Sequence, residues 1–307
     1  MTKRYRQVNR VLWVVLVLNY GVCALKLVVG SLAGSASIIA DGFHSLSDGS
    51  SNIVGLVGMS LAAKPADHDH AYGHAKYETL TATGIAAMLF VVALEVVKSG
   101  WDRLLHPVTP TIGFVQFAVM VATMGINLLV TLYEAGRGRA LKSDVLVSDA
   151  AHTRSDLYVS ASVLVGLVFV RLGFPIADAI ASIFVGAPIV KVGADIVRDS
   201  SRVLCDAAVL DPEEVAQAVI EVRGVAGCHK VRSRGRQDQV FLDLHVQVDE
   251  PLDLVQTHAL GHLVSERLRG RFPNVYDVSV HVEPSEARSA RRAAVGESAT
   301  KACRANS

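Results

Sequence analysis

The sequence predicts an integral membrane protein: an all-α bundle of six transmembrane helices, followed by a small cytoplasmic α+β domain. Hydrophobic residues make up 51% of the 307 residues and charged residues only 19%, whereas ordinary soluble domains carry about 25% charged residues. Apolar runs of about 20 residues, the length that crosses a bilayer, recur six times. After residue 204 the pattern changes to short amphipathic segments, which indicates a separate water-soluble domain.

The expected spans follow the apolar runs in order. The basic segment before the first run resembles a signal peptide, but the run is long and lacks a small-residue cleavage site, so we expect a retained span. We predict a cytoplasmic N-terminus at residues 1–10, a membrane domain at 11–204, a cytoplasmic domain at 205–285 and a disordered tail at 286–307. The six spans are expected at residues 11–29, 35–63, 79–97, 112–133, 145–172 and 176–192.

Basic residues set the expected orientation. They gather at the N-terminus, in the loop at 64–76, in a basic loop at 137–142 and at 191–202. With six spans, all four clusters fall on the same side, which the positive-inside rule assigns to the cytoplasm. We therefore expect a multi-pass protein of the inner (plasma) membrane with both termini cytoplasmic.

The soluble domain reads as α-β-β-α-β, a ferredoxin-like order. Residues 211–214, Asp-Pro-Glu-Glu, are typical of a helix N-terminus. Strand-like alternation follows at 229–234 and 240–248, then a helical segment at 254–269 and a last strand at 276–282. The two helices are expected to cover one face of the sheet and to leave the other face for a partner.

Several function classes are disfavoured. The net charge of +1 indicates no nucleic-acid partner. The four cysteines are scattered without a Cys-x-x-Cys motif, so they predict neither a disulfide framework nor a cysteine metal site. His-Glu-x-x-His and P-loop motifs are absent from the sequence, which argues against a metalloprotease and against ATP-driven pumping. We expect a protein that is not an enzyme.

Two identical polar pairs interrupt the second and fifth apolar runs. His44 and Asp48, and likewise His152 and Asp156, are four residues apart and share one helical face. Either pair alone fits a simple helix-surface hydrogen bond, but such groups are costly inside a membrane. Two pairs together offer two imidazoles and two carboxylates, a set that suits a tetrahedral divalent metal, zinc above all. Since metal binding displaces protons, such a site can exchange metal for protons.

Two further aspartates stand near these pairs. Asp41 and Asp149 each precede a motif histidine by three residues. One interpretation makes them acceptors that orient the imidazoles. The other places them on the helix face near an aqueous entrance.

Two other regions are rich in histidine. The loop after the second span contains Asp67, His68, Asp69, His70 and His74, which fit either a metal site or a solvated polar loop. The soluble domain contains a second set, for which scattered surface histidines are the simpler interpretation without a family comparison. This set is His229, His245, His258, His281 and Glu283, with His262 one helical turn after His258.

From residue 11 to residue 284 the chain resembles the cation diffusion facilitator family. The likeness rests on six spans, the two His-x-x-x-Asp pairs, the loop at 65–76 and the α-β-β-α-β domain. It implies a homodimer in the lipid bilayer that exports divalent metal by proton antiport. This resemblance implies three metal sites and one charge pair. The transport site consists of His44, Asp48, His152 and Asp156, and a loop site consists of Asp67, His70 and His74. A binuclear cytoplasmic site consists of His229, His245, His258, His281 and Glu283, and the charge pair that helps interlock the subunits is formed by Lys76 and Asp206.

The resemblance also bears on the metal. Relatives with two His and two Asp tend to prefer Zn2+, our first expectation for the transported and the regulatory ion, whereas an Asp in place of His44 tends to admit Cd2+. Fe2+ or Mn2+ is the alternative, because nitrogen and oxygen ligands also suit those ions. Arg154 within the second motif and Glu283, where some relatives have Asp, depart from the pattern. A different class of function is a metal sensor or membrane assembly scaffold that does not transport.

Overall fold

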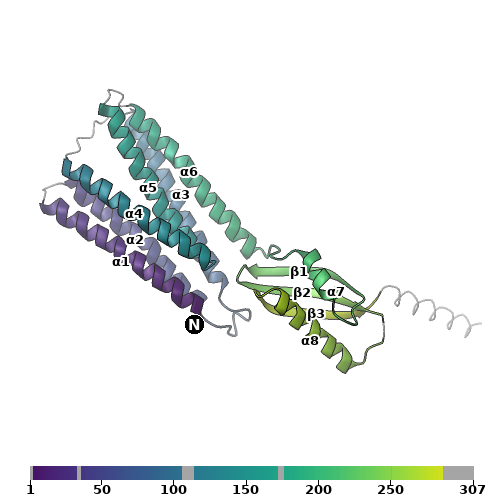
Figure 1. The fold of residues 1–307 in the computed structure, drawn as a ribbon. Coiled ribbons are helices and arrows are strands. Elements are labelled where there is room, and N and C mark those ends of the chain that lie inside the picture. The colour runs from purple at the N-terminus through teal and green to yellow at the C-terminus, as the bar shows by residue number, and fades with distance from the viewer. Residues whose placement is uncertain (1–2, 33–35, 106–113, 172–175, 250, 286–307) are drawn as a thin grey trace, which may run out of the picture. The chain divides into compact units, whose positions relative to one another are not determined.

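The computed structural model describes residues 3–32, 36–105, 114–171, 176–249 and 251–285. The chain folds as two compact units, Met1–Leu204 and Cys205–Ser307. The described part of the first unit consists of long helices (Figure 1). They are α1 (Lys3–Leu32), α2 (Ala36–Ala62), α3 (Lys76–Leu105), α4 (Phe114–Ala140), α5 (Asp144–Arg171) and α6 (Ile176–Leu204).

The six long helices match the six expected spans, but several helices continue well beyond the apolar runs. α6 runs on through its basic segment to Leu204, and α4 includes Arg137 and Arg139 in its last turn. The expected basic loop at 137–142 is therefore wrong, since the connection to α5 is only residues 141–143. Hydropathy marks the part of a helix that lies in lipid, whereas the hydrogen-bonded backbone continues into water.

Three helices are long and apolar enough to cross a membrane by length and composition, within the residues that the structure describes. They are Lys3–Val29 of α1, Lys76–Asp102 of α3 and Phe117–Ala140 of α4. α2 and α5 contain the two His-x-x-x-Asp pairs, which lower their apolar content. The outward surface of the unit carries large exposed apolar side chains such as Leu94, Leu129 and Phe184, as lipid contact requires.

The helices of the first unit pack around two apolar clusters. One joins α1, α2, α3, α4 and α5, and its members include Leu12, Met59 and Ile85. The other joins α3, α5 and α6 around Leu89 and Ile189. Gly58 of α2 lies so close to the Thr81 side chain of α3 that a Cβ there would collide with it. Close helix contact through small residues is typical of membrane bundles.

The second unit has the expected order α-β-β-α-β. Its elements are α7 (Pro212–Ile220), β1 (Gly227–Arg236), β2 (Gln239–Val248), α8 (Leu254–Arg271) and β3 (Val275–Pro284). The sheet order is β1-β2-β3. β1 and β2 pair antiparallel, and β2 and β3 pair parallel, connected through α8. Asp211 caps α7 as expected, and Asp253 and Gln256 form a capping box at the start of α8.

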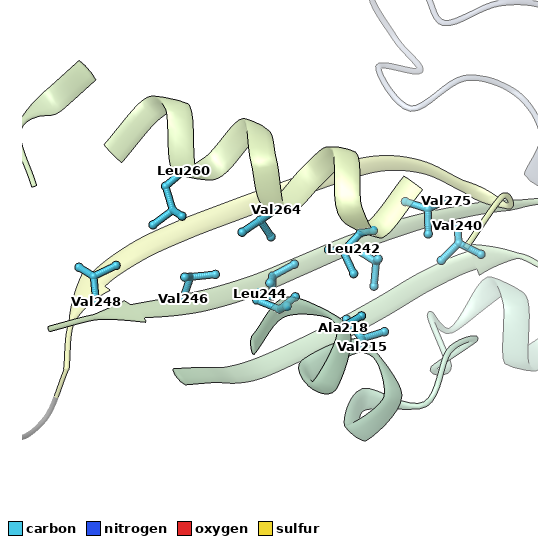
Figure 2. Close-up of a cluster of buried hydrophobic side chains, with 12 residues drawn as sticks. Val215, Ala218, Val240, Leu242, Leu244, Val246, Val248, Leu260, Val264 and Val275 are labelled. Carbon is cyan, nitrogen blue, oxygen red and sulfur yellow. The ribbon is translucent and has the colours of Figure 1, made fainter. Parts of the chain in front are cut away.

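The core of this unit lies between one face of the sheet and both helices (Figure 2). β2 alternates strictly, and its buried residues run from Val240 through Leu244 to Val248. Val215 of α7 and Val264 of α8 pack against that face. Because successive strand residues point to opposite faces, the odd-numbered residues of β2 face away from the helices. The fold class predicted from the sequence is confirmed.

Candidate metal centres

The two membrane pairs lie on helices that contact each other, α2 and α5. His152 is buried in α5 and Asp156 is half-buried one turn later. His44 and Asp48 both belong to α2, but their side chains lie outside the described part of the structure. The relative placement of the four ligands therefore remains an expectation.

A buried lysine neighbours this region and was missed by the sequence analysis. The Nζ of Lys26, on α1, donates a hydrogen bond to Ser45 Oγ at 2.8 Å, and both side chains are buried. Ser45 directly follows His44. The available signal was that Lys26 is the only charged residue in the first apolar run, and charged groups inside a span are rare without a function.

Asp149 belongs to a buried chain of polar side chains across three helices. Its Oδ2 accepts a hydrogen bond from the Asn52 side-chain amide of α2. Asn52 Oδ1 in turn accepts from the Asn19 amide of α1 at 2.8 Å. Asp149 is 0% exposed in this unit, and its hydrogen bond with Asn52 ties α5 to α2.

The loop residues Asp67, His70 and His74 come together. Their candidate ligand atoms all lie within 4.8 Å of one another. His74 Nε2 is 3.3 Å from Asp67 Oδ2, and His70 Nδ1 is 3.4 Å from Asp67 Oδ1. The turn closes because the His70 backbone N–H donates to Asp67 Oδ1 and because Gly73 adopts a positive φ of 83°. His68 and Asp69 lie outside this cluster and are fully or mostly exposed.

The electrostatics of the loop cluster suit a cation. His74 Nδ1 is 2.9 Å from the Pro65 carbonyl oxygen, which can only accept, so Nδ1 carries a proton and Nε2 is the nitrogen that a metal ion would bind. The hydrogen bond from the His70 backbone N–H lowers the pKa of Asp67, against a smaller opposing effect of burial. A neutral imidazole and an ionised carboxylate are the forms that bind metal. His74 Nε2 and Asp67 Oδ2 are 3.3 Å apart. Two ligand atoms around tetrahedral zinc are also roughly 3.3 Å apart, because each bond to the metal is about 2.0 Å long.

The cytoplasmic histidines are aligned by strand register. His229 of β1 pairs with His245 of β2, which pairs with His281 of β3. One row of residues across the sheet thus carries three imidazoles. Their ring centroids are separated by 5.4 Å between His229 and His245 and by 4.6 Å between His245 and His281.

Glu283 connects this row. Its Oε1 is 2.6 Å from His229 Nε2, and its Oε2 is 3.1 Å from His245 Nδ1. His281 Nε2 is farther away, at 4.0 Å from Oε2. The hydrogen bond from His245 is the main effect that lowers the pKa of Glu283, and the charges of His229 and His245 add to it. His229, His245 and Glu283 form the second cluster of possible metal ligands within the described residues.

The remaining expected site residues lie elsewhere. His258 lies on α8 beside His262, with 3.1 Å between the two Nε2 atoms, and both line a pocket that His281 of β3 also lines. Lys76 is the first residue of α3, and Asp206 belongs to the second unit, where its φ is 55°. Lys76 and Asp206 belong to different units, and the expected charge pair between them stays a prediction.

Comparison with known proteins decides the family. Residues 12–205 match the cation efflux transmembrane domain, and residues 210–285 match the cytoplasmic domain of cation efflux proteins. The chain belongs to the cation diffusion facilitator family. It is therefore a membrane-embedded cation efflux transporter, not an enzyme, as the sequence analysis predicted.

Relatives align along most of this transporter. It is 32% identical over 280 residues to an uncharacterised transporter of Methanocaldococcus jannaschii, covering 91% of this chain and 99% of the relative. It is 30% identical to the cation-efflux pump FieF of Serratia proteamaculans, covering 85% and 87%. It is 26% identical to the manganese efflux system protein MneS of Bacillus subtilis, covering 86% and 91%. Among solved structures, the metal-bound C-terminal domain of the CzcD transporter from Thermotoga maritima matches 24% of this chain and 94% of its own, at 26% identity and a TM-score of 0.22.

Proposed function

We propose that this transporter exports Zn2+ from the cytoplasm in exchange for protons. The observation that carries the proposal is the pair of His-x-x-x-Asp motifs on α2 and α5, two helices of one bundle that contact each other. His44, Asp48, His152 and Asp156 supply two nitrogen and two oxygen ligands, the number that tetrahedral zinc takes.

The coupling follows from the ligand chemistry. Zinc binds when the imidazoles are neutral and the carboxylates ionised, so protons leave as the metal arrives. Opened to the other side, the site releases zinc as protons return. Alternating access to a site near the bilayer midplane then couples the two fluxes without ATP.

We further propose that the loop and cytoplasmic clusters bind regulatory zinc in a homodimer. The donor sets fit: each cluster combines imidazole nitrogens with one carboxylate whose pKa is lowered. On the sheet, the row of histidines lies opposite the helix-covered face, which leaves it accessible to a second subunit. Zinc binding at this face would draw two cytoplasmic domains together and bias the membrane helices.

We place the protein in the inner (plasma) membrane with both termini in the cytoplasm. The support is the distribution of basic residues. Arg137 and Arg139 lie in the last turn of α4, next to the start of α1, where Arg4 donates to the carbonyl oxygens of Leu141 and Lys142. Arg202 lies in the last turn of α6.

Manganese or iron(II) is the second candidate substrate. A relative that is 26% identical is a manganese efflux protein, and imidazole and carboxylate ligands accept either ion. Cadmium is a further substrate to compare, because ligand preference alone discriminates weakly among divalent ions.

The experiment is metal-dependent proton movement in proteoliposomes, with Zn2+, Fe2+, Mn2+ and Cd2+ compared. Asp48→Ala and Asp156→Ala should abolish both fluxes. Asp195→Ala, which removes an exposed carboxylate of α6, is the matched control and should transport normally. If wild-type protein binds zinc but moves neither zinc nor protons, a metal sensor or assembly scaffold replaces the transporter proposal. If only Mn2+ or Fe2+ moves, the quartet is still the proposed transport site, but its substrate is that metal and not zinc.

A further inference from the structure

Glu134 is a buried carboxylate that belongs to none of the candidate metal sites. It lies on α4 and is 0% exposed. Neither of its carboxylate oxygens has a hydrogen-bond partner among the described residues. Burying an ionised carboxylate without a partner is costly, so the surroundings of Glu134 must supply a compensating group.

The group that Glu134 meets is another carboxylate. Asp149 of α5 is the charged side chain that acts on it. Asp149 is itself 0% exposed, and while its Oδ2 accepts from Asn52, its Oδ1 lacks a partner. One turn before Glu134 on the buried face of α4, the hydroxyl oxygen of Thr131 also lacks a partner. α4 and α5 therefore carry four buried oxygens without partners at these residues, and the three carboxylate oxygens among them can only accept when ionised.

Among the described side chains, Asp149 is the one charged group that acts on Glu134, and no basic group does so. The next basic residue on α4, Arg137, is exposed to solvent. From α1 and α2 the polar chain brings the neutral amides of Asn19 and Asn52. α1 has no charged residue between Arg10 and Lys26, and Lys26 is hydrogen-bonded to Ser45. On α5 the nearest titratable neighbours are Asp144, His152 and Arg154.

We propose that Glu134 and Asp149 form a buried proton site, separate from the metal ligands, whose single shared proton is released when metal binds. One proton between two carboxylates supplies the missing donor and removes one of the two like charges. A metal ion fits less well, because four oxygens fall short of the six to eight that Ca2+ takes and contain none of the imidazole or thiolate ligands that select zinc.

The site is linked to transport through α5. Asp149 stands three residues before His152, one turn away on the same helix. A divalent cation at the quartet favours the ionised form of nearby carboxylates. The proton that leaves Glu134 and Asp149 then adds to those displaced from the ligands themselves. This inference deepens the proposed antiport and rests on it.

The test counts protons released per zinc ion bound by the full-length protein in detergent, and protons exchanged per zinc ion transported in proteoliposomes. Glu134→Gln keeps the shape of the side chain and removes its titration. It should release one proton fewer per protein when zinc fills the membrane site, and exchange one proton fewer per zinc ion transported, while zinc affinity at the membrane site stays within a few-fold of wild type. Asp199→Asn, at an exposed carboxylate of α6 beyond the expected sixth span, is the control and should match wild type.

Unchanged proton counts in Glu134→Gln would overturn the inference, and so would loss of zinc binding, which would make Glu134 a ligand. If the variant does not fold, infrared difference spectra of wild-type protein replace it. Zinc addition should remove a protonated-carboxyl C=O band, and the absence of that change overturns the proposal. The spectra need no transport, so they separate failure of this site from failure of the antiport itself.

Discussion

Arg4 forms a salt bridge with the fully buried carboxylate of Glu78. Its two terminal nitrogens lie 2.9 Å and 3.1 Å from the two Glu78 oxygens, a bidentate geometry typical of strong charge-assisted pairs. Arg4 also donates to the carbonyl oxygens of Leu141 and Lys142, both at 2.8 Å. Ser143 donates to Glu78 at 2.6 Å. These contacts fasten the start of α1, the start of α3 and the α4–α5 turn to one another.

Breaking this pair should destabilise the membrane bundle. Arg4→Ala leaves a buried carboxylate without its main partner, and removing one member of a buried pair costs about 3–5 kcal/mol. Thermal unfolding in detergent should show a clearly lower midpoint for Arg4→Ala. Arg6→Ala, at an exposed position two residues later, is the control. If both variants unfold at the same temperature, the contact contributes little.

The loop cluster should bind zinc through His74. His74→Ala removes a buried imidazole whose Nε2 faces Asp67, so the full-length protein should bind one zinc equivalent fewer by isothermal titration calorimetry. His68→Ala changes a fully exposed imidazole outside the cluster and should leave the number of equivalents unchanged. Equal losses in the two variants would show that the loop binds metal without a defined geometry.

Glu283 should make the stability of the metal-free cytoplasmic domain depend on pH in the acidic range. Its pKa is lowered below the ordinary 4.5, first by the hydrogen bond from His245. A lowered folded-state pKa means that the contribution is present above 4.5 and is lost as pH falls through the lowered value. With a chelator present, Glu283→Gln should therefore flatten the decline in unfolding free energy below about pH 5. Glu266→Gln, at an exposed site on α8, should retain it.

Zinc should associate isolated cytoplasmic domains. Residues 205–285 have their own hydrophobic core, so the domain is expected to fold alone. Light scattering should show association or compaction on zinc addition, and Glu283→Ala should abolish the change because it removes the carboxylate between His229 and His245. Glu266→Ala should behave as wild type. A zinc titration without any change in the wild-type domain would refute the proposed regulatory step.

The sequence predicted the helices of the membrane bundle because apolar runs report directly where lipid surrounds the chain. It placed His229, His245 and His281 on strands, but not in one row, because the row depends on a parallel and an antiparallel pairing between segments distant in sequence. Glu134 was missed for a similar reason. It directly follows the expected fourth span, residues 112–133, where it reads as the polar end of a helix, and only the packing of α4 on α5 shows that it is buried.

The sequence analysis also did not predict the polar contacts of Asn19, Asn52 and Lys26. Each residue is a single polar position in an apolar or small-residue segment, and helix periodicity alone does not identify its partner on another helix. The sequence could, by contrast, predict the two His-x-x-x-Asp pairs as candidate metal ligands. His and Asp four residues apart share one helix face, whatever other residues surround them.

The central claim is that an outward flux of zinc is driven by an inward flux of protons through the quartet of His44, Asp48, His152 and Asp156. The most direct measurement imposes a pH gradient on proteoliposomes and follows zinc with an enclosed fluorescent indicator. Zinc should move against its own gradient in wild-type vesicles and in the Asp195→Ala control, and should not move in Asp156→Ala vesicles. Zinc movement in wild type that ignores the pH gradient, or that survives in Asp156→Ala, would contradict the account.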